Sequence, residues 1–142
     1  MKRIGIIGFG FMGKMHFKNY RQIEGVEVAA ICDIVKEKLT DKPQKAGNIE
    51  GADKKFDLAG CAIFTDVEKM FDEASLDAVS ITLPTYLHKE YTIKAIRAGL
   101  HVLCEKPMAL NSSDSQEMID VAQQYEKVLQ IGHCIRFWPE YM

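Results

Sequence analysis

The chain has 142 residues and carries 18 Lys and Arg against 20 Asp and Glu, which leaves a formal net charge of −2. This length fits one domain, and a composition of 47% hydrophobic and 27% charged residues is typical of a globular protein with an apolar core. The near balance of charge gives no general attraction to nucleic acid or to anionic membranes. No apolar stretch approaches the roughly 20 residues that span a bilayer, so we expect neither nucleic acid nor membrane as a partner.

The chain contains four cysteines: Cys32, Cys61, Cys104 and Cys134. Their spacing includes neither a C-x-x-C pair nor a Cys/His cluster of the kind that binds zinc. We therefore expect reduced structural thiols, no metal site and a cytoplasmic protein. The opening MKRIGIIGFGFMGKM has the basic start of a signal peptide, but four glycines interrupt its apolar run, so we expect no secretory leader.

The beginning of the chain predicts a strand, a glycine-rich turn, a helix and a second strand. Residues 3–7 (RIGII) contain three isoleucines and are β-branched and apolar enough for a buried strand. From Met12 the pattern changes to three- and four-residue steps, which predicts a helix that stops at Gly25. The residues that we expect to share one face of this helix are Met12, Met15, His16, Asn19, Tyr20 and Ile23. Residues 26–32 (VEVAAIC) predict a second buried strand, which completes a parallel βαβ unit.

A charged stretch separates this unit from the rest of the chain. Residues 35–55 contain six Lys and four Asp or Glu, together with proline and glycine, and predict a short helix followed by an exposed excursion. Thr65 and Glu68 then have the spacing of a capping box, in which each side chain satisfies a backbone N–H group of the other residue. We expect a short helix to begin there.

The remaining residues alternate between strand and helix patterns. The predicted strands are 77–83, 101–104 and 128–131. The predicted helices are 87–98, ended by Gly99, and a helix that begins after an N-cap at Asn111 or Ser113 and runs to about Tyr125. Regular β/α alternation with short connections predicts an α/β fold of a single domain, a doubly wound parallel sheet with helices on both faces, as in a Rossmann fold.

Gly8, Gly10 and Gly13 form the pattern G-x-G-x-x-G, directly after a predicted strand and at the start of a predicted helix. The first glycine permits a tight turn, the second lets a pyrophosphate approach the backbone, and the third lets helix and strand pack closely. Free N–H groups and the helix dipole favour a diphosphate at this position. Glycine turns also occur for conformational reasons alone, so this motif requires support from elsewhere in the chain.

Asp33 supplies that support. It lies 20 residues after Gly13 at the end of the second predicted strand, where a carboxylate can accept hydrogen bonds from an adenosine ribose. Its alternative role is to cap the following turn. An acidic residue at this position repels a 2′-phosphate, so we expect NAD as the cofactor. Lys36 and Lys38 lie close enough in sequence to bind a 2′-phosphate, which keeps NADP open as a second cofactor.

Glu105, Lys106 and Pro107 follow the predicted strand 101–104, at the sheet edge where open α/β proteins bind their ligands. A lysine held beside a nicotinamide in a dry cleft can donate to a substrate oxygen. A lysine salt-bridged in a turn has the same local sequence, and the local pattern does not choose between the two.

Several segments together resemble the Gfo/Idh/MocA oxidoreductase family. They are GFGFMG near the N-terminus, Asp33, LPTYLH at 83–88, AGLHVLCEKPMAL at 98–110 and GHCIRFWPEY at 132–141. The resemblance implies an NAD(P)-dependent dehydrogenase that transfers a hydride between the nicotinamide cofactor and a secondary alcohol of a sugar, cyclitol or related polyol. It further implies that the full-length protein is a homo-oligomer.

The resemblance also assigns roles to individual residues. The cofactor-binding residues that it implies are Gly8, Gly10, Phe11, Met12, Gly13, Asp33, Pro84, Thr85, His88, Glu105 and Lys106. Lys106 would also reach the reacting substrate oxygen, which makes it the one candidate catalytic residue. Thr85 stands where asparagine is commoner in the family. His133 and Arg136 match the entry to the substrate cleft, and the bond before Pro107 is often cis.

The resemblance implies a protein of two domains. We therefore expect residues 1–134 to form the dinucleotide-binding domain and residues 135–142 to begin a linker to a second domain. That second domain would supply most of the substrate pocket, and the chain alone is then expected to bind cofactor with little or no turnover. The alternative is a non-catalytic, nucleotide-sensing Rossmann module that acts through a protein partner. Lys106 separates the two hypotheses, because a sensor has no need of a lysine at the nicotinamide.

Overall fold

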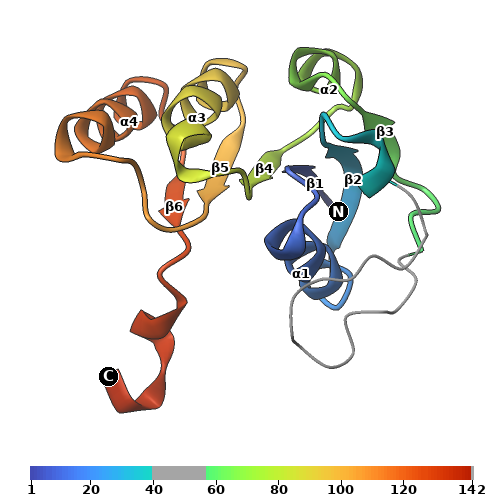
Figure 1. Ribbon diagram of the computed structural model, residues 1–142, viewed down its shortest axis with the longest axis horizontal. Helices are drawn as coiled ribbons and strands as arrows, with labels where there is room; N and C mark the ends of the chain where they lie inside the picture. Colours follow the sequence, from blue (N-terminus) through green and yellow to red (C-terminus); the bar gives the residue numbers. More distant parts are fainter. Residues whose placement is uncertain (40–56, 142) are drawn as a thin grey trace.

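The computed structural model describes residues 1–39 and 57–141 (Figure 1). Within this part of the chain, six strands form one sheet in the order β3-β2-β1-β4-β5-β6, and every neighbouring pair is parallel. The strands are β1 (Lys2–Ile7), β2 (Val26–Cys32), β3 (Ala62–Phe64), β4 (Ala78–Ile81), β5 (His101–Cys104) and β6 (Leu129–Ile131). The α-helices are α1 (Phe11–Tyr20), α2 (Val67–Glu73), α3 (His88–Arg97) and α4 (Ser112–Gln124). The predicted doubly wound parallel sheet is confirmed.

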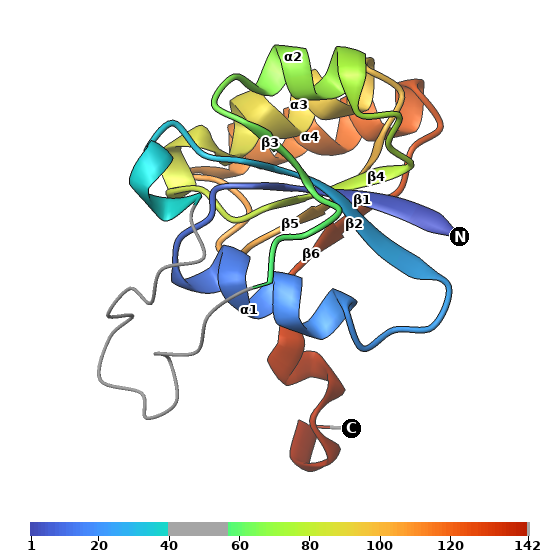
Figure 2. The same cartoon turned by 90° about the vertical axis from the view of Figure 1, so that its right-hand side faces the viewer.

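The helices are divided unequally between the two faces of the sheet. Figure 2 shows α2, α3 and α4 together on one face and α1 on the other. The larger core lies beneath the three helices and includes Met70, Ile96 and Met118, all fully buried. The smaller core lies beneath α1, where Phe9 and Phe17 pack edge to face with their ring centroids 5.8 Å apart. Each face of the sheet is thus covered by apolar side chains, which explains why its strands are almost continuously apolar.

The direction in which the sheet grows reverses between β1 and β4. The chain passes from β1 to β2 and β3 on one side, then returns across the sheet to β4, β5 and β6 on the other. Right-handed crossovers in opposite directions place α1 on one face and the later helices on the other. In open α/β sheets the carboxyl ends of the two strands at such a reversal border a crevice, and this crevice is where ligands bind.

Several predicted boundaries differ from the structure. The short helix begins at Val67 because Asp66 is its N-cap, with the carboxylate accepting a 3.1 Å hydrogen bond from the Lys69 N–H group, so the expected capping box of Thr65 and Glu68 is wrong. Strand β3 was not predicted, since its three residues are largely exposed and follow the charged stretch. The helix expected after residue 35 is a 3₁₀ turn over Lys36–Lys38, and residues 40–56 of the charged excursion lie outside the described residues.

The face expected for α1 is also not the one it buries. Its buried residues are Gly13, Lys14 and Phe17, whereas Met12 and Met15 are each 38% exposed. The helix lies close to the sheet because Gly13 has no side chain, and Phe17 then fills the space one turn later. The later elements agree more closely with the prediction. Among them, α4 begins after Asn111, whose side-chain oxygen accepts a 2.8 Å hydrogen bond from the Asp114 N–H group.

All four cysteines are free. Cys32 and Cys104 are buried at the ends of β2 and β5. Burial raises the pKa of the Cys32 thiol to about 12 and that of the Cys104 thiol to about 11. Both therefore pack as small neutral apolar groups.

Candidate functional site

The glycine turn after β1 is shaped by close backbone contacts. Gly8 has φ +92°, a conformation that favours glycine, and a side chain there would lie 3.0 Å from the carbonyl oxygen of Thr82. A Cβ atom on Gly13 would collide with the carbonyl oxygen of Gly8. Gly10, the N-cap of α1, has nothing within 4 Å of the place where its Cβ would be. The chain therefore turns tightly out of β1 and leaves open space in front of the helix.

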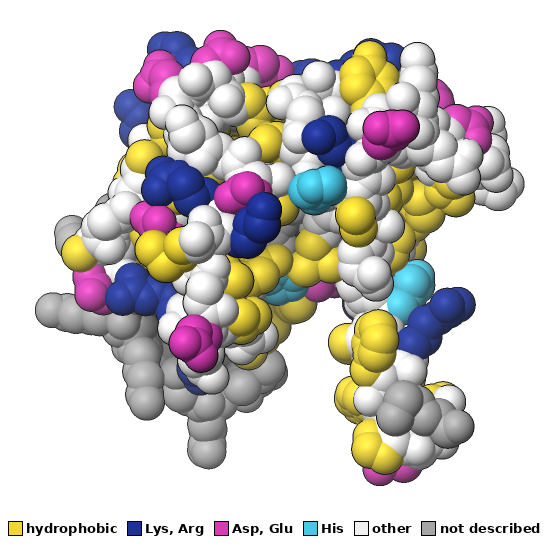
Figure 3. Space-filling view, turned by 180° about the vertical axis from the view of Figure 1, so that it is seen from behind, with side chains coloured by type: hydrophobic (Ala, Val, Ile, Leu, Met, Phe, Trp, Pro, Cys, Tyr) yellow, Lys and Arg dark blue, Asp and Glu magenta, His cyan; other side chains and the backbone are white. Residues whose placement is uncertain are grey.

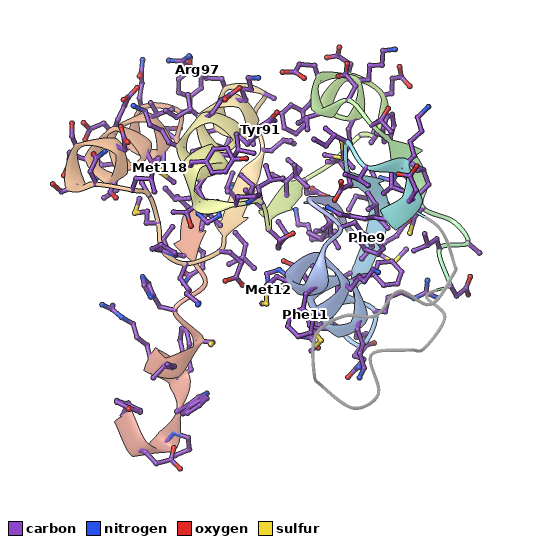
Figure 4. The ribbon with its side chains drawn as sticks, in the orientation of Figure 1. Phe9, Phe11, Met12, Tyr91, Arg97 and Met118 are labelled. Atoms are coloured by element: carbon purple, nitrogen blue, oxygen red, sulfur yellow. The ribbon has the colours of Figure 1, made fainter. Side chains whose placement is uncertain are left out.

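The N-terminus of α1 is suited to an anion. No acidic residue lies in its first turn, so no carboxylate of the helix competes for the free backbone N–H groups. Figure 4 shows Phe9 directed inward, whereas Phe11 and Met12 lie on the outer surface of the first turn. Phe9 is fully buried, and Phe11 and Met12 are 40% and 38% exposed. The backbone of Phe11 and Met12 is thus accessible from the open side, as the predicted pyrophosphate contact requires.

Thr82 holds this turn from the opposite strand and was not identified from the sequence. Its hydroxyl donates to the carbonyl oxygen of Gly8 at 2.5 Å, and its N–H group donates to the carbonyl oxygen of Ile7 at 2.9 Å. The residue directly follows β4, the strand that lies beside β1 in the sheet but 70 or more residues away in sequence. A threonine at the end of an apolar strand was the only signal available in the sequence.

Asp33 follows β2, as predicted, and its carboxylate is 5% exposed. One oxygen accepts a 2.7 Å hydrogen bond from the Phe9 N–H group, and the other accepts a 2.9 Å bond from the Val35 N–H group. Lys38 forms an ion pair with the same carboxylate at 3.2 Å. Asp33 therefore braces the glycine turn. Both oxygens also accept from Lys38, at 3.4 and 3.2 Å, so the predicted ribose contact requires the ribose to replace Lys38 at this carboxylate.

A second lysine lies near this carboxylate. Lys14 on α1 is buried, and burial lowers the pKa of its ammonium group, with the neighbouring charge of Lys38 adding to the decrease and Asp33 opposing it. The surroundings of Asp33 thus combine one carboxylate with two cations. These opposite charges repel a 2′-phosphate less strongly than an isolated aspartate does.

The loop after β4 contains the predicted residues Pro84, Thr85 and His88. Thr85 begins a 3₁₀ turn, Thr85–Leu87, that leads into α3. The His88 ring is 1% exposed, and its two nitrogens lie 2.8 Å from the carbonyl oxygens of Leu83 and Pro107. His88 therefore joins the loop after β4 to the turn after β5. A direct contact of its buried ring with a cofactor stays a prediction.

The turn after β5 carries Glu105, Lys106 and Pro107. Glu105 is buried and Lys106 is exposed, and the peptide bond between Lys106 and Pro107 is cis, in agreement with the resemblance. One oxygen of Glu105 accepts from the Lys106 N–H group at 3.1 Å, and the other lies 2.9 Å from Nε2 of His16. His16 carries no signal of a site role in the sequence, because its partner is 89 residues away.

A pocket of about 470 Å³ opens beside this turn. It is lined by Lys106, Gly132, His133, Cys134, Ile135, Arg136 and Tyr141. The structure thus brings Lys106 together with His133 and Arg136, the residues that the resemblance placed at the substrate cleft. Figure 3 shows the segment after β6 as a separate arm rich in apolar surface, and Phe137 is 69% exposed.

Within residues 1–39 and 57–141, no group of three or more His, Cys, Asp or Glu is placed to hold a metal ion. No helix in the same residues is long and apolar enough to cross a membrane.

Comparison with known proteins assigns most of the chain to the family that the sequence resembles. Residues 2–133 match the family model Gfo/Idh/MocA, described as an oxidoreductase family with an NAD-binding Rossmann fold. A myo-inositol 2-dehydrogenase of Thermotoga maritima is 32% identical over 95% of this chain, and a 2,7-anhydro-N-acetylneuraminate hydratase of Mediterraneibacter gnavus is 31% identical over 97%. The chain spans 37% and 33% of the length of these two relatives.

A similar solved structure is that of scyllo-inositol dehydrogenase from Lactobacillus casei with bound NAD(H) and scyllo-inositol. It superposes with a TM-score of 0.81 at 29% identity, over 99% of this chain and 38% of that one. The family model, the sheet order and the glycine turn agree with one another. The chain therefore belongs to the Gfo/Idh/MocA oxidoreductase family and forms its NAD-binding Rossmann fold.

Proposed function

We propose that this chain is the cofactor-binding part of a dehydrogenase that transfers a hydride between NAD and a secondary alcohol of a cyclitol, sugar or related polyol. The observation that carries the proposal is the position of Lys106. This exposed cation follows β5, borders the 470 Å³ pocket and lies at the same sheet edge as the glycine turn. A cation at this position serves chemistry at the nicotinamide end, which nucleotide binding alone does not require.

The residues of the site fit a dinucleotide. The open space at Gly10 and the free N–H groups of α1 accommodate a pyrophosphate. The Asp33 carboxylate would accept from the adenosine ribose in place of the Lys38 ammonium group. NAD, when bound, supplies the hydride acceptor. Glu105 and Lys106 would then lie at the nicotinamide ribose, with the Lys106 ammonium group donating a hydrogen bond to the substrate oxygen. In the direction of alcohol oxidation the hydride passes to NAD, and the hydroxyl proton passes to a base outside residues 1–142.

Two relatives support the proposed substrate class. Both the Thermotoga maritima relative and the Lactobacillus casei structure are inositol dehydrogenases, and the latter holds scyllo-inositol with NAD(H). Because this chain spans 37–39% of the length of such proteins, we assign the complete reaction to a longer protein. In that protein residues outside 1–142 complete the substrate pocket beside Lys106. We further propose a cytoplasmic location, in keeping with four free cysteines, and a homo-oligomeric full-length protein.

The first experiment is calorimetric titration of the 142-residue chain with NADH and with NADPH, in parallel with Asp33→Ala. We expect wild-type protein to bind NADH more tightly than NADPH, and the variant to lose most of its NADH affinity. A full-length protein is then screened with inositols and sugars for NADH formation. Absence of NADH binding by the folded wild-type chain would refute the proposal.

The Mediterraneibacter gnavus relative favours a second candidate reaction. That protein is a hydratase, and its 31% identity to this chain is close to that of the inositol dehydrogenase. A hydratase adds or removes water and leaves the substrate without net oxidation. The substrate screen separates the two reactions, because a dehydrogenase accumulates NADH in proportion to product, whereas a hydratase forms product without net accumulation of NADH.

A nucleotide-sensing module is the remaining alternative. It predicts that the Lys106→Ala variant of the full-length protein retains its whole function, because only cofactor binding and a partner contact matter. The dehydrogenase predicts loss of turnover with little change in NADH affinity. Measuring kcat and the NADH dissociation constant of this one variant distinguishes the two hypotheses.

A further inference from the structure

His16 connects three elements of the fold beneath the nicotinamide end of the site. It lies on α1, and both of its ring nitrogens have partners. Nδ1 lies 2.6 Å from the hydroxyl oxygen of Ser80 on β4, and Nε2 lies 2.9 Å from a carboxylate oxygen of Glu105 at the end of β5. The side chains of His16 and Glu105 are each 12% exposed. This contact is therefore largely shielded from water.

The chemistry of Ser80 and Glu105 determines which atoms donate and which accept in these two hydrogen bonds. A carboxylate only accepts, so the Nε2–H group of His16 donates to Glu105. In the neutral ring Nδ1 then accepts from the Ser80 hydroxyl. Tyr20, one turn further along α1, packs edge to face against the His16 ring with the ring centroids 6.1 Å apart, and burial raises the pKa of its phenol. Both ring nitrogens of His16 therefore have buried partners, Ser80 and Glu105.

The Glu105 carboxylate is constrained on its other sides as well. Its second oxygen accepts from the Lys106 N–H group at 3.1 Å. Gly132, which follows β6, lies so close that a Cβ atom there would be 3.2 Å from the carboxylate. With His16 on one oxygen and Lys106 on the other, the carboxylate has one orientation, and that orientation fixes the backbone of Lys106.

We propose that His16 is a positioning residue that holds Glu105, and through it Lys106, in register with the glycine turn. The same helix carries Gly10 at its N-terminus and His16 further along, so a single rigid element sets the pyrophosphate position and the Glu105 carboxylate together. The inference rests on the proposed function, since it assigns the nicotinamide half of NAD to Glu105 and Lys106. It adds a residue that contacts neither cofactor nor substrate.

The test compares two ligands that differ only at the nicotinamide end. NADH consists of ADP joined to a nicotinamide riboside, so ADP reports on the glycine turn and Asp33 alone. We expect His16→Ala to weaken NADH binding about tenfold, the effect of one hydrogen bond to a charged group, and to change ADP binding by less than about twofold. Asn19→Ala, an exposed position on the same helix, serves as the matched control and should change neither.

A conservative variant separates positioning from folding. The His16→Gln side chain retains an N–H donor that can reach Glu105, so we expect it to recover most of the NADH affinity lost in His16→Ala. Equal weakening of NADH and ADP in both variants would overturn the inference in favour of a purely structural role, and unchanged NADH binding would overturn it as well. If the wild-type chain bound NADH no more tightly than ADP, the nicotinamide riboside would contribute no affinity. That result would refute the proposed function and the inference with it.

Discussion

The hydroxyl of Thr82 donates a 2.5 Å hydrogen bond to the carbonyl oxygen of Gly8, joining the ends of two strands that are adjacent in the sheet but far apart in the chain. The same hydroxyl lies 3.2 Å from the carbonyl oxygen of Ile7. Gly8 itself is held on its other side, where its N–H group donates to the carbonyl oxygen of Cys32 at 2.8 Å. The first glycine of the turn is thus fixed from both neighbouring strands, before any ligand binds.

Replacing Thr82 by valine tests this contact. The variant keeps the shape of the side chain and loses the donor, so we expect the free energy of unfolding to fall by about 1–2 kcal/mol. NADH affinity should fall with it, because the glycine turn is less constrained. Urea denaturation and calorimetric titration give the two quantities.

Thr92→Val is the matched control for this experiment. The Thr92 hydroxyl is fully buried beside the Cys104 thiol and has no hydrogen-bond partner of regular geometry in the described part of the chain. Its removal should therefore leave stability unchanged or raise it. Equal losses in the two threonine variants would show that the bond to Gly8 contributes nothing specific.

Lys38 should control discrimination between the two nicotinamide cofactors. Its ammonium group pairs with the Asp33 carboxylate at 3.2 Å and offsets the charge that repels a 2′-phosphate. We expect Lys38→Ala to weaken NADPH binding about fivefold, while NADH binding changes little. Lys36→Ala, in the same 3₁₀ turn, is the control. A Lys36 variant with the same loss, or a Lys38 variant with none, would contradict this assignment.

His88 should contribute more to stability than an exposed histidine does. Its buried ring lies against two carbonyl oxygens, those of Leu83 and Pro107, which lose this partner in His88→Ala. We expect the free energy of unfolding to fall by about 2–4 kcal/mol. His101 is exposed and accepts one 3.0 Å bond from the Val128 N–H group, so His101→Ala should cost less than about 1 kcal/mol. Chemical denaturation of both variants provides the comparison, and equal losses would disprove the bracing role.

Alkaline pH should destabilise the protein through its buried thiols. Burial raises the pKa of Cys32 to about 12 and that of Cys104 to about 11 in the folded chain. The unfolded chain loses these protons first, from about pH 8.5 upward, so the free energy of unfolding falls as the pH rises toward the folded values. The decrease reaches at most about 1.4 kcal/mol per pH unit for each thiol.

The Cys32→Ala variant isolates this effect. It removes one titrating thiol, so the slope of stability against pH, measured by urea denaturation between about pH 9 and pH 11, should become shallower whatever the absolute stability of the variant. Identical slopes in the variant and the wild type would show that Cys32 is not shielded as the structure indicates.

The parts of the site that the sequence revealed are those fixed by local geometry. Gly8 and Gly13 are required by backbone contacts within one turn, and Asp33 ends the very next strand, so their order in the chain was informative. The partners of His16 and Thr82 lie 64 to 89 residues away, and no pattern in the chain indicates such pairings.

Helix α1 shows why hydrophobic periodicity alone did not predict which face of the helix is buried. Met12 and Met15 have apolar side chains, as core residues do, but they lie on the side of the helix that faces away from the sheet. The contact with the sheet depends on Gly13, which contributes to packing by having no side chain, and hydrophobicity patterns give such a residue little weight. Strand β3 was missed for a related reason, since its three residues form an exposed sheet edge.

Of the six strands, β1 is synthesised before the others but lies in the middle of the sheet, so its two edges are covered at different times as the chain is made. One edge pairs with Val26–Cys32 soon afterwards, whereas the other must wait for Ala78–Ile81. During that interval the nascent chain exposes the unpaired N–H and C=O groups of a strongly apolar strand, which is the kind of edge that promotes aggregation. Strand β4 therefore also protects β1 from aggregation. If a ribosome stalls before residue 78, this edge of β1 stays unpaired.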